Sequence, residues 1–174
     1  MNASLVITLV GTDRPGLVNA LAARAAECGA NWLESSMAQL AGKFAGVVRL
    51  SVAENDVGKL EAALRALEGD DLRLTIERGA MAAAAGRTTR LELLGQDRPG
   101  IVREISAVLA RHGASIEKLD TCCENASFSG EPLFRAEIAV QVPAGLEPAS
   151  LKADLEALAN ELMVDLTLEG DTEN

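Results

Sequence analysis

The sequence predicts an α+β protein built from two copies of one domain, each an antiparallel four-stranded sheet with two helices on one face. The first observation is a repeated segment. Residues 10–37 and 94–121 align at an offset of 84 and share the pattern Gly-x-Asp-Arg-Pro-Gly. The second is the order of the apolar runs, because each half reads strand, helix, strand, strand, helix, strand. This order is that of the ferredoxin-like βαββαβ sandwich.

The first half opens with the apolar run LVITLV (5–10), which predicts a buried strand ending at Gly11. Asp13 is the expected N-cap of the first helix, Pro15 suits its first turn, and Gly29 is its expected stop. The remaining elements are strands over 32–40, 44–52 and 72–77, and a helix that Asp56 caps and that carries Leu60, Leu64 and Leu67.

The second half repeats this order. Its strand over 133–142 alternates cleanly, which indicates one covered and one more exposed face. The apolar positions are Phe134, Ala136, Ile138, Val140 and Val142. The other elements are strands over 91–94, 116–124 and 164–169, and helices over 99–112 and 151–162.

These elements give a first domain over 1–78, a linker over 79–88, a second domain over 89–170 and an acidic tail over 171–174. With both helices on one face, the other sheet face stays open. Val6 and Val10 make this face apolar in the first strand. Because an open apolar face needs a partner, we expect the two halves, or two chains in a homodimer, to cover it.

Composition excludes several classes of protein. The net charge of −10 and the pI near 4.6 argue against direct nucleic-acid binding, which needs a basic surface. No stretch approaches the ~18 apolar residues of a membrane span, and no basic region precedes the first strand as in a signal peptide. Three cysteines make no disulfide framework. We therefore expect a cytoplasmic protein.

The repeated loop is the candidate ligand site. It ends at a helix N-terminus, where free backbone N–H groups favour a carboxylate, and its aspartate could face an ammonium group. A free amino acid carries both. The candidate residues are Gly11, Thr12, Asp13, Arg14, Pro15, Gly16 and Asn31 in the first half, and Gly95, Gln96, Asp97, Arg98, Pro99, Gly100 and Ser115 in the second. Ordinary helix capping is the alternative, because duplication also copies structural residues.

No catalytic or metal-binding set is apparent in the sequence. The single histidine, His112, falls on the apolar side of a helix end and reads as a packing residue. Cys122 and Cys123 are neighbours on one strand and point to opposite faces, so they do not chelate one metal easily. Cys28 reads as a small packing residue, and the loop lacks a nucleotide-binding pattern. We expect neither an enzyme nor a cofactor.

The loop D-x-P-G-[IL]-V, followed by G-A-N or G-A-S inside a βαββαβ repeat, resembles the ACT domain, a module that senses small molecules. Two such domains and nothing more resemble the glycine cleavage system transcriptional repressor family. This resemblance implies ligand binding at 11–16 with Asn31, and at 95–100 with Ser115. Ser115 stands where asparagine is usual and the connection over 125–132 is long, so the two halves need not bind equally.

The resemblance also implies a non-catalytic regulator that senses a small amino acid, with glycine as the candidate. Such a protein acts through a protein partner and affects transcription indirectly. Two alternatives stay open. The chain is a ligand-free interaction or dimerisation module, or it is a regulatory subunit of an amino-acid or one-carbon metabolic enzyme.

Overall fold

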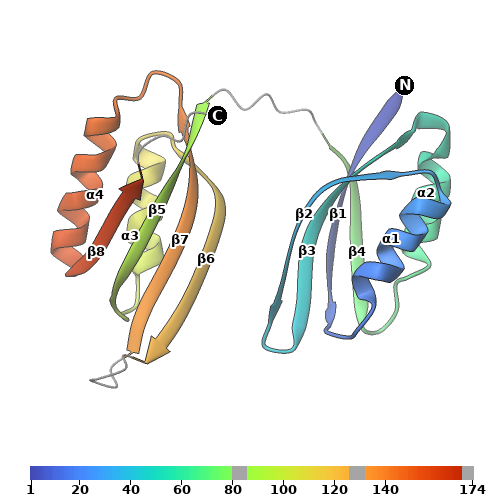
Figure 1. The fold of residues 1–174 in the computed structure, drawn as a ribbon, viewed down its shortest axis with the longest axis horizontal. Coiled ribbons are helices and arrows are strands. Elements are labelled where there is room, and N and C mark those ends of the chain that lie inside the picture. Colours follow the sequence, from blue (N-terminus) through green and yellow to red (C-terminus); the bar gives the residue numbers. More distant parts are fainter. Residues whose placement is uncertain (80–85, 126–131, 170–174) are drawn as a thin grey trace. The chain divides into compact units, whose positions relative to one another are not determined.

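The computed structural model describes residues 1–79, 86–125 and 132–169. The chain divides into two compact units, Met1–Ala82 and Ala83–Asn174. Each unit is a four-stranded antiparallel sheet with two α-helices, as the sequence predicts, and Figure 1 shows both. The predicted fold class is therefore confirmed for each unit, and the two are described separately below.

The first domain has the strand order β2-β3-β1-β4, with β1 central and paired to both β3 and β4. Helices α1 and α2 lie on the same side of this sheet (Figure 1). The elements are β1 (Asn2–Thr12), α1 (Leu17–Glu27), β2 (Asn31–Leu40), β3 (Lys43–Ala53), the short 3-10 helix η1 (Glu54–Asp56), α2 (Val57–Arg65) and β4 (Leu72–Arg78).

Strand β1 is buried on one face only. Leu5, Ile7 and Leu9 are at most 4% exposed, whereas Val10 is 48% exposed. This apolar run thus has one face in the core. Its β-branched residues Val6, Thr8 and Val10 lie on the other face, on the open side of the sheet. The first domain therefore has an apolar patch on its open face, to which Val47 of β3 contributes.

Helix α1 starts later than the sequence suggested. Gly16, with a φ of 89°, is the N-cap, and no side chain caps the helix. Asp13 and Pro15 therefore belong to the preceding turn, and the prediction of Asp13 as the cap is wrong. The predicted stop is confirmed: the N–H groups of Gly29 and Ala30 donate to the Ala26 and Ala25 carbonyls, which closes the helix in a Schellman motif.

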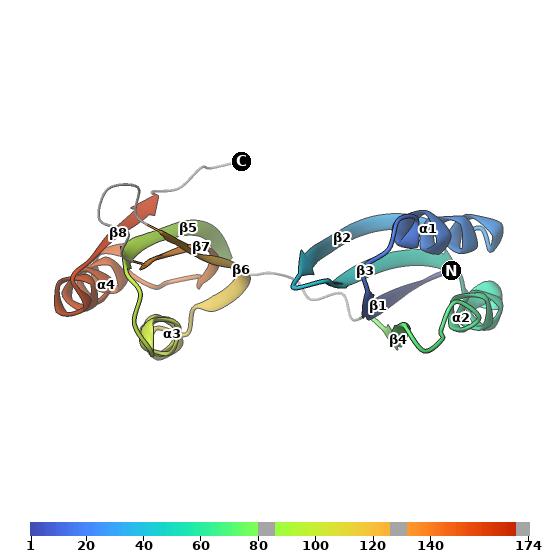
Figure 2. The ribbon, with the colours of Figure 1, turned by 90° about the horizontal axis from the view of Figure 1, so that it is seen from below.

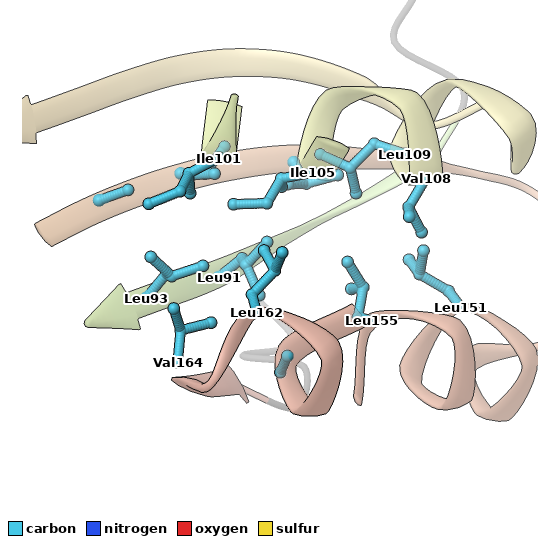
Figure 3. Close-up of a cluster of buried hydrophobic side chains, with 14 of the residues drawn as sticks. Leu91, Leu93, Ile101, Ile105, Val108, Leu109, Leu151, Leu155, Leu162 and Val164 are labelled. Atoms are coloured by element: carbon cyan, nitrogen blue, oxygen red, sulfur yellow. The ribbon is translucent and has the colours of Figure 1, made fainter. Parts of the chain in front are cut away.

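The second domain has the strand order β6-β7-β5-β8, with β5 central. Figure 2 shows α3 and α4 on one side of this sheet. The elements are β5 (Gly86–Gln96), α3 (Ile101–Arg111), β6 (Ser115–Asn125), β7 (Pro132–Pro143), α4 (Pro148–Leu162) and β8 (Val164–Glu169). The core of this domain consists of aliphatic side chains from both helices and the sheet, such as Ile105, Leu109 and Leu155 (Figure 3).

Several element limits differ from the predicted ones. Strand β5 begins at Gly86, so 86–88 extend the first strand of the second domain rather than the linker. Helix α3 begins at Ile101 because Gly100 is its N-cap with a φ of 101°. Asp56 does occupy the N-cap position of α2, but its side chain makes no capping hydrogen bond. The predicted tail (171–174) lies outside the described residues.

Candidate functional site

The loop between β1 and α1 is fixed by backbone contacts to neighbouring segments. The Thr12 N–H donates to the Asp71 carbonyl at 2.8 Å, and the Asp13 N–H donates to the Gly42 carbonyl at 3.0 Å. Gly11 has no room for a side chain, because a Cβ there would clash with the Asp71 carbonyl oxygen. This glycine is thus required by close packing of β1 against the segment before β4.

Gly16 plays a different part in the same loop. Its positive φ lets the chain turn into α1, and the Ala20 N–H donates to the Gly16 carbonyl at 2.8 Å as the first bond of the helix. The N–H groups of Leu17, Val18 and Asn19 therefore have no acceptor within the helix. No heavy atom lies within 4 Å of the Cβ position of Gly16, so the space above this helix end is open.

The side chains of the first loop are free to meet a solute. Asp13, Arg14 and Pro15 are exposed. Among the described residues, Arg14 has no ion pair or side-chain hydrogen bond. On the other side of the loop, the Lys43 ammonium group donates a hydrogen bond to the Thr12 hydroxyl at 3.1 Å. The first loop thus presents a carboxylate and an unpaired guanidinium group close together in sequence.

The second loop has the same backbone shape but a different charge arrangement. A Cβ at Gly95 would lie 2.7 Å from the Val164 Cβ, and the Asp97 N–H donates to the Pro132 carbonyl at 3.0 Å. The Arg98 guanidinium group contacts a Glu104 carboxylate oxygen at 2.8 Å. The second Glu104 oxygen lies 3.3 Å from the Cβ position of Gly100. An internal carboxylate thus already occupies the space beside this helix end.

Asn31 and Ser115 do not join the loops of their own domains. Asn31 pairs with Ser51, which pairs with Ser4, whereas the loop starts seven residues further along β1 at Gly11. At a rise of about 3.3 Å per residue, these rows lie ~23 Å apart. Ser115 lies at the corresponding far end of the second sheet, opposite Gln141. Neither side chain can therefore complete a site with the loop of its own domain, and the contact of each with a ligand stays a prediction.

A small pocket that sequence reasoning missed lies beside the first loop. It has a volume of about 20 Å³ and is lined by Arg14 together with ten apolar residues. We call it the Arg14 pocket; its lining includes Leu17, Ala20, Met37 and Phe44. Leu17, Met37 and Phe44 are only partly buried, so the pocket reaches the surface. Arg14 is the only charged residue in the lining.

The corresponding residues of the second domain are packed more tightly. At the positions of Leu17 and Phe44 stand Ile101 and Phe134, which are 2% and 8% exposed. At the position of Ala20, which lines the Arg14 pocket, stands Glu104. The two domains thus share a fold but differ where the loop meets the core.

The cysteines and the histidine differ in their surroundings. Cys28 is buried, whereas Cys122 and Cys123 are exposed. A hydrogen bond to Glu124 is the main cause that raises the pKa of Cys122, and burial, followed by the charge of Asp97, raises the pKa of Cys123. Both thiols thus stay protonated at neutral pH. The His112 Nε2 atom lies 2.9 Å from the Asp154 carboxylate and ties α3 to α4.

Neither a metal cluster nor a membrane span emerges from the part of the chain that the structure describes. No group of three or more His, Cys, Asp or Glu side chains is placed to hold a metal ion there. No helix in the same part is long and apolar enough to cross a membrane.

Comparison with known protein families identifies the domain that occurs twice in the chain. The ACT domain matches the chain twice, over residues 3–77 and 89–160. The chain belongs to the ACT-domain family. Both domains are thus ACT domains in tandem, as the resemblance of the loop implied.

Two curated relatives match most of the chain. The glycine cleavage system transcriptional repressors of Escherichia coli (strain K12) and Shigella flexneri are each 28% identical over 162 residues. The alignments cover 91% of this chain and 85% of the relatives. The predicted resemblance to this group of regulators is confirmed.

Two solved structures match nearly the whole chain. An unknown protein from Galdieria sulphuraria is 32% identical, with a TM-score of 0.86 and coverage of 97% of this chain and 98% of that one. A proposed glycine cleavage system transcriptional repressor is 23% identical, with a TM-score of 0.71 and coverage of 97% of both chains. At that identity the second match shows the shared fold alone.

Proposed function

We propose that this tandem ACT protein senses a small amino acid through the loop of its first domain and passes the signal to a protein partner. The observation that carries the proposal is the unpaired Arg14 beside the open N-terminus of α1. A guanidinium group and free backbone N–H groups bind a carboxylate, and the exposed Asp13 carboxylate can receive the ammonium group of the same molecule. The role named for its curated relatives, transcriptional repression of the glycine cleavage system, supports a regulatory function.

The regulation we propose is indirect. A chain with a net charge of −10 lacks the basic surface that phosphate contacts require, so the protein would act on transcription through another protein. The apolar open face of the first domain, with Val10 and Val47 at 48% and 44% exposed, supports association with a further protein surface or with a second copy of the chain.

A homodimer would also offer a way for Asn31 to reach a ligand at the loop. This side chain lies at the far end of its own sheet from the loop. If an Asn31 side chain contacts a ligand at the first loop, it must come from a second copy of the chain. Sedimentation at several protein concentrations, with and without ligand, tests this part of the proposal.

A thermal-shift screen of the full chain against the twenty amino acids tests ligand sensing. Trp32 is the only tryptophan and there is no tyrosine, so tryptophan fluorescence reports the first domain alone. A ligand at about 100 times its Kd adds ~2.7 kcal/mol to stability. We expect a selective rise in the Trp32 transition. If no amino acid raises the Trp32 melting temperature, the sensor proposal is wrong, and the result favours the alternative of a ligand-free interaction module.

A substitution at Arg14 separates ligand binding from folding. Arg14 is exposed, so Arg14→Gln should leave the Trp32 melting temperature without ligand unchanged and remove the rise with ligand. Gly16 is a poorer target, because its φ of 89° means that any side chain there also strains the loop.

A further inference from the structure

The Arg14 pocket combines one charged lining residue with an apolar remainder. Arg14 is exposed, and the other lining residues, such as Leu9, Leu21 and Phe44, are apolar. A ligand that satisfies both parts has an anionic head and an apolar group attached close to it. Glycine has only the head, and it would leave the apolar interior unused.

The size of the Arg14 pocket limits the apolar group. A cavity of roughly 10–15 Å³ holds one water-sized group. The pocket has about 20 Å³ and opens toward the surface beside the partly buried Leu17 and Met37. This space holds roughly one to two water-sized groups, so the methyl group of alanine fits inside it, and the side chain of valine fits with one part at the open end. A phenyl or indole ring does not fit unless Phe44 or Met37 moves.

The second domain contains the same loop with the site already filled. Glu104 replaces Ala20, its carboxylate contacts Arg98 at 2.8 Å, and its other oxygen lies above Gly100. Arg103 lies 3.7 Å from the same carboxylate. Since an external carboxylate would have to displace Glu104 from two cations, the second loop is closed to it.

From these observations we infer that the first ACT domain selects an amino acid with a short aliphatic side chain, and that the second domain binds none. The α-carboxylate lies at Arg14, the side chain enters the Arg14 pocket, and Glu104 acts as a built-in substitute for the ligand in the second loop. This inference rests on the proposed function and names its ligand class and its single site.

Isothermal titration of the full chain tests the inference. The probes are glycine, L-alanine, L-valine and L-phenylalanine, with propanoate and 3-methylbutanoate as the carboxylates that correspond to alanine and valine without the ammonium group. We expect one site per chain. L-valine should bind roughly tenfold or more tightly than glycine, because each buried methylene strengthens binding about fourfold.

Two alanine positions on α1 provide a matched pair of variants. Ala20→Glu copies the second domain and should let the new carboxylate pair with Arg14, which abolishes L-valine binding. Ala23→Glu adds the same charge one turn away at an exposed position outside the pocket lining, and binding should persist. The Trp32 melting curve shows whether each variant is folded.

The outcomes separate this inference from the proposed function. Glycine binding as tightly as L-valine, or equal losses in the Ala20→Glu and Ala23→Glu variants, would overturn the inference and leave amino-acid sensing intact. Two sites per chain would also overturn it. Binding of 3-methylbutanoate as tight as that of L-valine, lost in Ala20→Glu, would retain the pocket but contradict amino-acid sensing. The absence of any binding would overturn both.

Discussion

Gly11 offers the sharpest test of how the loop is held, and we predict that Gly11→Ala destabilises the first domain strongly. A Cβ at this position meets the Asp71 carbonyl oxygen, and it lies 3.1 Å from Leu72 Cδ1 and 3.2 Å from Leu72 Cα. Two of the three nearest atoms are backbone, so the segment before β4 must move. The same carbonyl accepts the Thr12 N–H at 2.8 Å, and this bond would be weakened.

The expected cost follows from these contacts. Overpacking of this kind costs about 1–3 kcal/mol, and the weakened hydrogen bond adds about 1 kcal/mol. For a domain of this size each kcal/mol lowers Tm by roughly 4–8 °C, so the Trp32 transition should fall by about 8–32 °C.

Gly58→Ala is the matched control. Gly58 lies in α2 of the same domain, and no heavy atom is within 4 Å of its Cβ position. Alanine there should stabilise by about 0.4–1 kcal/mol, because it restricts the unfolded chain. Both variants are measured by Trp32 fluorescence during heating. A Gly11→Ala transition within two or three degrees of wild type, or a fall of equal size in Gly58→Ala, would refute the packing argument.

Three further predictions concern side-chain contacts. His112→Ala should lower the circular-dichroism melting temperature of the second domain by the worth of one hydrogen bond to Asp154, about 1 kcal/mol, and an unchanged curve would mean that this contact is not stabilising. The Cys122 thiol should react slowly with iodoacetamide at pH 7 and faster above pH 9, because its pKa is raised; peptide mapping measures this, and rapid labelling at pH 7 would contradict it. The hydrogen bond from Arg78 lowers the pKa of Glu54, so this pair stabilises the first domain above the unfolded pKa near 4.5, and the contribution is lost as pH falls through the lowered value. Arg78→Met should remove that acid-dependent part of the Trp32 melting profile, and an unchanged profile would show that the pair does not contribute.

The sequence predicted the fold well because its signals are local and occur twice. The alternation in β7 marks the core face, and Phe134, Ala136 and Ile138 are all buried. The glycines after α1 and α3, Gly29 and Gly113, both have positive φ and both end a helix. Each of these features depends on a few neighbouring residues, which a linear pattern can contain.

The candidate site was harder to predict because it depends on the path of the chain through the whole domain. The resemblance grouped Asn31 with the loop, but α1 carries the chain back along the sheet and leaves Asn31 at the opposite end. The Arg14 pocket is formed by residues from nearly the whole length of the first domain, between Leu9 and Leu74. The closure of the second loop depends on one side-chain contact between Arg98 and Glu104. An alignment of the two halves shows only that Glu104 takes the place of Ala20, and it does not show this contact.

The most direct measurement is a titration of the ¹⁵N-labelled full chain with L-valine, followed through its amide ¹H–¹⁵N spectrum. Both loops are observed in one sample, so the second acts as an internal control for the first. We predict saturable shifts for the amides from Arg14 to Asn19 and none for those from Arg98 to Arg103. Equal shifts in both loops, or no shift in either up to the solubility limit of L-valine, would contradict a ligand site at Arg14.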